Sequence, residues 1–198
     1  MEKLAGIVLA AGLSSRMGKF KPLLEIGGVS MIRRVVQLVQ RAGADPVIVV
    51  TGHRRKELEA HLAGVAVEFV HNPDYAATQQ LESLQLALAK LSEDCGRVMV
   101  SPVDIPLVRP DTVERLLAAE GEFIRPRCGE RTGHPVVLGG GLIPFVRGYD
   151  GPGGLSGAVK QSGCLIRDVL VDDPNILVDN DTWSDFQRTL ARFEEDGR

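Results

Sequence analysis

A segment near the N-terminus has the residue types that bind phosphate groups. Residues 9–24 combine small residues with cations, namely Gly12, Gly18, Arg16, Lys19 and Lys21. Small residues let backbone N–H groups approach phosphate oxygens closely, and the lysine and arginine side chains add full positive charges. This loop is therefore the first candidate for a triphosphate-binding site.

The spacing within this loop excludes two common phosphate-binding motifs. A Walker A loop requires Gly-x-x-x-x-Gly-Lys-Ser/Thr. Here, five residues separate Gly12 from Gly18, and Lys19 is followed by Phe20. The chain contains no Gly-x-Gly-x-x-Gly either. The alternative is that the glycines only form tight turns and that the cations are solvated.

The elements around the loop predict an α/β fold. Residues 4–10 are an unbroken apolar segment, typical of a strand buried on both faces of a parallel sheet. Alternating strands and helices predict a doubly wound, mostly parallel, Rossmann-like sheet, in which ligands bind at the carboxyl ends of the strands. The other predicted strands are residues 46–51, 65–70 and 97–101, and the predicted helices are residues 29–42, 54–64, 78–91 and 110–119.

The composition changes in the last third of the chain. Glycines recur from residue 121 to residue 163, so we expect a loop-rich region that closes over the sheet. Short, partly antiparallel strands and a terminal helix are predicted at residues 123–125, 135–138, 165–171 and 182–195. We expect a single domain, residues 1–198, with a nucleotide-binding half (1–120) and an acceptor-binding half that includes the terminal helix (121–198).

Composition excludes several classes of partner. The formal net charge is −3, which gives no broad basic surface for nucleic acid. The N-terminal apolar segment is too short to span a membrane, and the three cysteines are far apart in the sequence. We expect a cytoplasmic protein with no nucleic-acid or membrane partner.

The loop also carries a family resemblance that extends over nearly the whole chain. Its pattern, Leu-Ala-Ala-Gly-x-x-x-Arg-Met-Gly-x-x-Lys-x-Leu, resembles the signature of the molybdenum cofactor cytidylyltransferases and guanylyltransferases. Four later segments of the chain resemble the cytidylyltransferase branch in particular. They are residues 72–75, 104–107, 133–138 and 179–182. The resemblance implies a nucleotide-diphospho-sugar transferase-like fold with a loop-rich, partly antiparallel acceptor region.

The resemblance also assigns roles to individual residues. Arg16, Lys21 and Asp104 would be catalytic, with Asp104 and Asp181 holding Mg²⁺, and His134 would contact the acceptor. Mg²⁺ that bridges phosphates usually takes one or two protein carboxylates, so two aspartates would suffice. The implied nucleotide-binding residues are Leu9, Ala10, Ala11, Gly12, Arg16, Gly18, Lys21, Asn72 and Ser83.

Three of these residues also have purely structural interpretations. Asp104 precedes Pro106 and would suit a turn, and Asp181 would suit the N-cap of the terminal helix. His134 would suit a hydrogen-bonded corner between a loop and a strand.

The expected reaction is Mg²⁺-dependent transfer of a nucleotide, with pyrophosphate released after in-line attack by an acceptor phosphate. The expected donor is CTP, with GTP as the alternative. The expected acceptor is a molybdopterin-type cofactor, with delivery of the product to a cofactor-accepting enzyme. The alternatives are a sugar-phosphate or polyol-phosphate acceptor, and a regulatory or chaperone-like protein that binds nucleotide without turnover.

Two segments depart from the family pattern. Residues 78–84 replace the Gly-Met-x-x-Ser-Leu start of a helix that helps hold the nucleoside, and only Ser83 and Leu84 match. Residues 154–159 replace Gly-Asp-x-Gly-Ala-Arg, so that Leu155 and Val159 take the places of the acid and the arginine. The first change affects the expected preference for the nucleotide base, and the second affects the expected identity of the acceptor.

Overall fold

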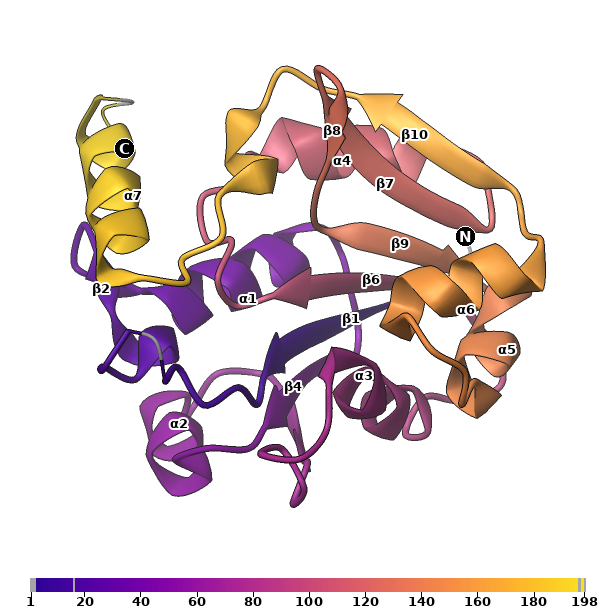
Figure 1. Ribbon diagram of the computed structural model, residues 1–198, viewed down its shortest axis with the longest axis horizontal. Helices are drawn as coiled ribbons and strands as arrows, with labels where there is room; N and C mark the ends of the chain where they lie inside the picture. Colours follow the sequence, from indigo (N-terminus) through magenta and orange to yellow (C-terminus); the bar gives the residue numbers. More distant parts are fainter. Residues whose placement is uncertain (1–2, 16, 196, 198) are drawn as a thin grey trace.

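The computed structural model describes residues 3–15, 17–195 and 197, and a mixed β-sheet forms the centre of the molecule (Figure 1). In this described part of the chain the main sheet has eight strands, in the order β10-β7-β9-β6-β1-β4-β5, with β8 paired to β7. The strands are β1 (Lys3–Ala10), β4 (Val47–Thr51), β5 (Glu68–His71), β6 (Cys95–Pro102), β7 (Phe123–Cys128), β8 (Arg131–Thr132), β9 (Val136–Gly139) and β10 (Ile166–Leu170).

Most strands of this sheet are parallel. Strand β1 lies between β4 and β6 and runs parallel to both, and β5 continues the parallel order beyond β4. Strand β9 is antiparallel to β6 on one side and to β7 on the other, while β10 is parallel to β7. The sequence-based prediction of a mostly parallel sheet with an antiparallel part after residue 120 is thereby confirmed.

Helices cover both faces of the sheet. One apolar layer includes side chains of α1, α2, α4 and α7, and the other includes side chains of α3, α5 and α6. Figure 1 shows α3, α5 and α6 gathered at the lower right and α7 at the left. The helices are α1 (Met31–Arg41), α2 (Arg55–His61), α3 (Gln80–Leu88), α4 (Pro110–Ala118), α5 (Leu142–Gly148), α6 (Gly154–Ser162) and α7 (Trp183–Glu195).

The start of α1 differs from the prediction because of a small hairpin. Strands β2 (Glu25–Ile26) and β3 (Val29–Ser30) pair antiparallel, so Val29 belongs to a strand rather than to the helix. Ser30 is the N-cap of α1, and its hydroxyl accepts a hydrogen bond from the Arg33 N–H.

The glycine-rich region from residue 121 to 163 is not mainly loop, which corrects the prediction. It contains α5 and α6, whose apolar residues, among them Val146 and Val159, belong to the core of the sheet face that α3 also covers. Glycines flank both helices, and burial of one apolar side suffices to keep such short helices folded. Gly157 lies inside α6 because a Cβ at this position would collide with the Pro152 carbonyl.

In the described part of the chain, no helix is both long and apolar enough to cross a membrane.

Candidate active site

The loop after β1 contains one glycine that the fold requires and one that it does not. Gly18 has a φ of +68°, a conformation that side chains other than glycine rarely adopt. Gly12 is not among the described residues with positive φ, and a Cβ added there would meet no atom within 4 Å. The open space in front of Gly12 suits close approach of a ligand to the backbone, so tight turning alone does not account for this glycine.

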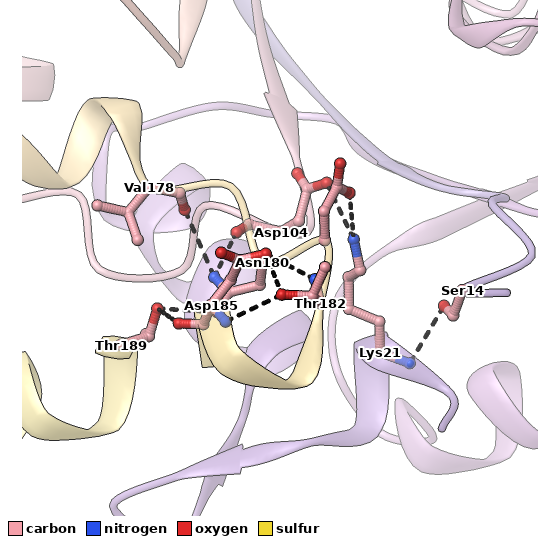
Figure 2. Close-up of polar contacts among 9 residues, drawn as sticks. Ser14, Lys21, Asp104, Val178, Asn180, Thr182, Asp185 and Thr189 are labelled. Atoms are coloured by element: carbon pink, nitrogen blue, oxygen red, sulfur yellow. Dashed lines mark hydrogen bonds and ion pairs between the residues drawn. The ribbon is translucent and has the colours of Figure 1, made fainter. Parts of the chain in front are cut away.

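The loop ends in a short 3₁₀ turn, Lys21–Leu23, that fixes the direction of Lys21. The Lys21 N–H donates to the Ser14 hydroxyl at 3.2 Å, and Pro22 is buried in the turn. Lys21 is 8% exposed, so its long side chain is held along the protein rather than in solvent. Its ammonium group points to the carboxylate of Asp104, which follows the next strand in the sheet (Figure 2).

Two carboxylates converge on the Lys21 ammonium. Its Nζ lies 3.4 Å from Asp104 Oδ2 and 3.1 Å from Asp181 Oδ1. Asp104 follows β6, the neighbour of β1, and Asp181 precedes α7. Lys21 and Asp181, which are 160 positions apart in the sequence, therefore meet at the carboxyl edge of the sheet. Because a lysine that is nearly buried needs a paired negative charge, this contact also stabilises the local structure.

The same pair of carboxylates has the chemistry to hold a divalent metal ion. Two aspartate carboxylates that lie together beside the Lys21 ammonium match the one or two carboxylates that Mg²⁺ usually takes beside phosphates and water. The Asp181 side chain is 42% exposed, which leaves it accessible to a ligand. No group of three or more histidine, cysteine, aspartate or glutamate residues suited to a metal occurs in the part of the chain that the structure describes. The residues therefore fit a metal shared with a phosphate ligand, and not a closed structural metal site.

A third carboxylate, Asp179, shows that the site is negatively charged overall. Burial raises the pKa of Asp179 above its ordinary value, and the nearby charges of Asp104 and Asp181 raise it further. Lys21 and Arg131 act in the opposite direction but are smaller influences on this pKa. A cation or an additional proton is thus favoured in this part of the site.

Asn180 connects the two halves of the carboxylate pair. Its side-chain Nδ2 donates to the Asp104 carbonyl at 2.7 Å, and its backbone N–H donates to the same carbonyl at 3.2 Å. The Thr189 hydroxyl of α7 donates to Asn180 Oδ1 at 2.8 Å (Figure 2). The sequence analysis assigned no role to Asn180, because a buried side chain that bonds to the backbone of a distant loop leaves no local spacing signal.

The N-terminus of α7 is capped without Asp181. The Asp185 carboxylate accepts from the Thr182 N–H at 2.7 Å, and the Thr182 hydroxyl accepts from the Asp185 N–H at 3.2 Å. This reciprocal pair is a capping box. The alternative interpretation of Asp181 as the helix cap is therefore wrong, and its carboxylate faces Lys21 instead.

His134 lines both a hollow of about 390 Å³, which Asp104, Asp179 and Asp181 also line, and a cavity of about 730 Å³ beside it. Its backbone N–H donates to the Ile176 carbonyl at 3.1 Å, and its Nδ1 atom is buried without a hydrogen-bond partner among the described residues. Burial lowers the pKa of His134 below its ordinary value, although the charge of Asp104 opposes this shift. A neutral imidazole is therefore favoured at this position.

Asn72 and Ser83 are both buried, and they contact each other. The Asn72 amide donates to the hydroxyls of Ser83 and Thr78, each at 2.9 Å, and its Oδ1 accepts from the Asp74 N–H. These bonds hold the segment between β5 and α3 in place. The nucleotide-binding role of Asn72 and Ser83 stays a prediction.

The remaining predicted nucleotide-binding residues lie at the end of β1. Leu9, Ala10 and Gly12 line a hollow of about 80 Å³ that also includes Lys21 and Asp104. Ala11 is buried, and its carbonyl accepts from the His53 N–H. Arg16, which was predicted to bind the triphosphate, lies outside the described residues.

Gln80 was missed by the sequence analysis. It is the first residue of α3 and lines the hollow at the loop, a second hollow of about 390 Å³ around the three carboxylates, and the larger cavity beside them. Its sequence context matched no motif, because its importance arises only where α3 starts against the sheet edge.

Comparison with known proteins identifies the family. Residues 6–165 match the family model described as the MobA-like NTP transferase domain. The chain belongs to this family of nucleotidyltransferases. The described loop after β1 and the convergent carboxylates lie at one edge of the sheet of this family member.

Two solved structures resemble nearly the whole chain. A nucleotidyl transferase from Methanothermobacter thermautotroptrophicus, Mth528, is 28% identical, with a TM-score of 0.85 over 99% of this chain and 100% of its own. Rv0371c from Mycobacterium tuberculosis H37Rv is 26% identical, with a TM-score of 0.82 over 96% of this chain and 98% of its own. Rv0371c has also been solved in complex with manganese.

The curated relatives are longer proteins. A bifunctional IPC transferase and DIPP synthase from Rubrobacter xylanophilus is 35% identical over 129 residues, which are 62% of this chain. This chain spans 28% of that relative's length.

Proposed function

We propose that this protein transfers CMP from CTP to a small phosphorylated acceptor, a molybdopterin-type cofactor, and releases pyrophosphate. The observation that carries this proposal is the convergence of Lys21, Asp104 and Asp181 beside the open space in front of Gly12. Membership in the family supports nucleotidyl transfer, and the choice of CTP and of the acceptor extends the resemblance noted in the sequence.

In the proposed reaction, the end of β1 and its loop hold the triphosphate, and residues 121–198 hold the acceptor. Lys21 neutralises the charge that develops at the α-phosphate during in-line attack by the acceptor phosphate. Asp104 and Asp181 would hold a Mg²⁺ ion, which when bound neutralises phosphate oxygens and supports departure of pyrophosphate. The bonds from Asn180 to the Asp104 carbonyl keep the two aspartates in a fixed relation.

No covalent intermediate is needed. Phosphoryl-group transfer between phosphates depends mainly on positioning and charge neutralisation, which this site supplies through Lys21, the carboxylates and the loop backbone. His134 lies where an acceptor phosphate would approach the carboxylates, and as a neutral imidazole it can accept or donate one hydrogen bond there. Its proposed role is to orient the acceptor.

The test is thermal unfolding with each of the four ribonucleoside triphosphates, with and without Mg²⁺. A ligand present at about 100 times its Kd stabilises the folded state by about 2.7 kcal/mol. We expect a Mg²⁺-dependent increase in Tm with CTP that is lost in Asp104→Ala. The matched control is Asp150→Ala, which removes an exposed aspartate that lies outside the hollows described above.

The two parts of the proposal fail in different ways. A shift with GTP in place of CTP would reject only the choice of donor. No shift with any triphosphate would reject the proposed function. Where the shift is seen, release of pyrophosphate in the presence of candidate acceptors measures turnover.

A further inference from the structure

The loop after β1 has an exposed tip between two buried side chains. Met17 is 7% exposed and Phe20 is 6% exposed, whereas Gly18 and Lys19 between them lie at the surface. The positive φ of Gly18 belongs to a backbone region that glycine enters at little cost, so the tip has more conformational freedom than its neighbours. The two apolar side chains attach the loop to the core, and the tip needs a further contact to hold its shape.

The Lys19 side chain makes such a contact with the first residue of α7. Its ammonium group lies over the Trp183 ring, 4.4 Å from the ring centroid. A cation this close to the face of an indole ring is attracted by the negative charge of the π system. The contact joins the phosphate-binding loop to the helix that Asp181 precedes.

Trp183 is the better fixed of the two partners. Its ring centroid lies 5.3 Å from that of Phe186, a core residue that is 3% exposed. The capping box of Thr182 and Asp185 holds the first turn of α7 around it. Because the ring is attached to the core and Lys19 is on an exposed loop, the contact fixes the loop rather than the helix.

The start of α7 therefore contacts two lysines of the same loop. Phe20 between them has an extended backbone, with φ −73° and ψ 97°, and an extended residue places the side chains of its two neighbours on the same side. Lys21 reaches Asp181 at 3.1 Å, and Lys19 reaches Trp183. Residues 181–183 thus hold the C-terminal end of the loop beside the carboxylates.

We propose that Trp183 is a positioning residue that acts through Lys19 and holds the phosphate-binding loop in the shape that receives the triphosphate. This inference rests on the proposed nucleotidyl transfer. A loop that is already ordered loses less conformational entropy when its ligand binds, so the contact strengthens binding although Trp183 itself does not touch the triphosphate. The chemical step is left to Lys21, Asp104 and Asp181.

The experiment measures the Kd of the triphosphate that stabilises the protein, by calorimetry in the presence of Mg²⁺. We expect Trp183→Leu to raise this Kd about 3-fold to 5-fold, the order of effect that an exposed cation–π contact gives. Trp183→Phe keeps an aromatic face for the ammonium group and should raise the Kd less. In steady-state kinetics, KM for the triphosphate should rise by the same factor in Trp183→Leu while kcat stays unchanged, because the loss concerns binding and not the transition state.

A double-mutant cycle tests whether Trp183 acts through Lys19. Lys19→Met removes the ammonium group and keeps most of the side chain; Lys19 is exposed, so this variant is expected to fold. In the Lys19→Met background, Trp183→Leu should cause no further increase in Kd, since the contact is already absent.

The matched control lies near the other end of α7. The Arg34 guanidinium lies over the Phe193 ring at 4.6 Å, which is the same kind of contact on the same helix but outside the loop. We expect Phe193→Leu to lower the urea midpoint and to leave the Kd of the triphosphate unchanged. The control thereby separates attachment of α7 from positioning of the loop.

The outcomes separate this inference from the proposed function. An unchanged Kd in Trp183→Leu overturns the inference and leaves the proposed function intact. Fully additive effects of Trp183→Leu and Lys19→Met also overturn it, as does an equal rise in Kd in Phe193→Leu. No binding of any triphosphate to the unsubstituted protein overturns both.

Discussion

At the scale of single residues, Lys21 is held in place at both its backbone and its side chain. Its side chain is 10% exposed, its backbone is held by Ser14, and its ammonium lies between Asp104 and Asp181. A phosphate ligand would approach from the side of Gly12, where space is open. The lysine is thus held beside the two carboxylates, where its ammonium group could donate to a phosphate oxygen.

The first prediction concerns Lys21→Ala. We expect kcat to fall by about 10²-fold to 10³-fold, since removing one positioned charge-stabilising group typically has an effect of this size. The fold should persist, because the surrounding apolar core does not depend on the ammonium group. Pyrophosphate release under saturating substrate measures the effect. The control is Lys56→Ala, an exposed lysine on α2; comparable activity losses in the two variants would argue against the assigned role of Lys21.

The site residues that could be predicted from the sequence are those that belong to recognisable motifs. Lys21, Asp104 and Asp181 belong to short segments with recognisable spacing, and the structure brings all three together. Gln80 and Asn180 act through contacts that form only when α3 and the segment before α7 reach the sheet edge. No local pattern encodes such contacts, so they could not be predicted from spacing.

At the scale of elements, the segment before α7 is held to the loop after β6 by Asn180. This side chain is 0% exposed, and its amide satisfies the Asp104 carbonyl while its oxygen accepts from Thr189. The position of Asp181 relative to Asp104 therefore depends on the attachment of α7.

The second prediction is that Asn180→Ala lowers both stability and activity. The substitution removes the side-chain bonds from Asn180 to the Asp104 carbonyl and from Thr189 to Asn180. The backbone N–H at position 180 still donates to that carbonyl, and the Thr189 hydroxyl still reaches the Asp185 carbonyl, so we expect a cost of roughly 0.5–1.5 kcal/mol for each lost bond. Chemical denaturation measures the free energy of unfolding. Thr189→Val removes only the hydroxyl, which bonds to Asn180 Oδ1 and to the Asp185 carbonyl, and should have a smaller effect. If the two substitutions are fully additive in the double variant, Asn180 and Thr189 do not act as a unit.

The sequence predicted the elements unequally, and burial explains the difference. Strands β1, β4 and β6 are buried on both faces and produce continuous apolar segments, so their positions were close to the predicted ones. Helices α5 and α6 are short, and the glycines next to them make their apolar pattern hard to recognise in the sequence. Their helical form depends on packing against the sheet, which single-sequence periodicity does not report.

The third prediction concerns the contact between α2 and α1. Burial and the Arg33 guanidinium lower the pKa of His61, with Glu25 opposing the shift. His61 Nε2 accepts hydrogen bonds from the Ser30 hydroxyl at 2.7 Å and from Arg33 Nε at 3.3 Å, which requires the neutral ring. The unfolded chain therefore binds a proton at His61 more readily than the folded chain does.

The sign of the pH dependence follows from this difference. The contribution of neutral His61 is fully present above the unfolded pKa, about 6.5, and is lost as pH falls through the lower folded pKa. As the pH falls from about 7.5 to 5, we expect the free energy of unfolding to decrease less in His61→Gln than in the wild type. Denaturation at several pH values measures this slope. Arg33→Gln should raise the His61 pKa in an NMR titration; an unchanged pKa would contradict the stated influence of Arg33.

At the scale of the whole molecule, the residues before and after position 120 share one sheet and both of its apolar layers. Strand β6 pairs with β9 from Arg97 to Val100, which joins residues before and after position 120. At the other end, Phe186 of α7 packs in the same apolar layer as α1, and Arg34 stacks on Phe193 at 4.6 Å. The chain thus returns to its N-terminal half, and Figure 1 shows α7 beside the start of α1.

The last prediction is that the two halves unfold together. The chain has a single tryptophan, Trp183 at the start of α7, whose ring lies 4.4 Å from the Lys19 ammonium of the phosphate-binding loop. Its fluorescence reports on the attachment of α7, while far-UV circular dichroism reports on the whole fold. Because separating α7 would expose the apolar layer that it shares with α1 and the sheet, we expect the two signals to give the same urea midpoint. CTP with Mg²⁺ should raise both midpoints equally, since the proposed site takes Lys21 from one half and Asp181 from the other. A fluorescence transition that precedes the loss of circular dichroism would instead mean that α7 detaches on its own, and Asp181 would then leave Asp104 before the sheet unfolds.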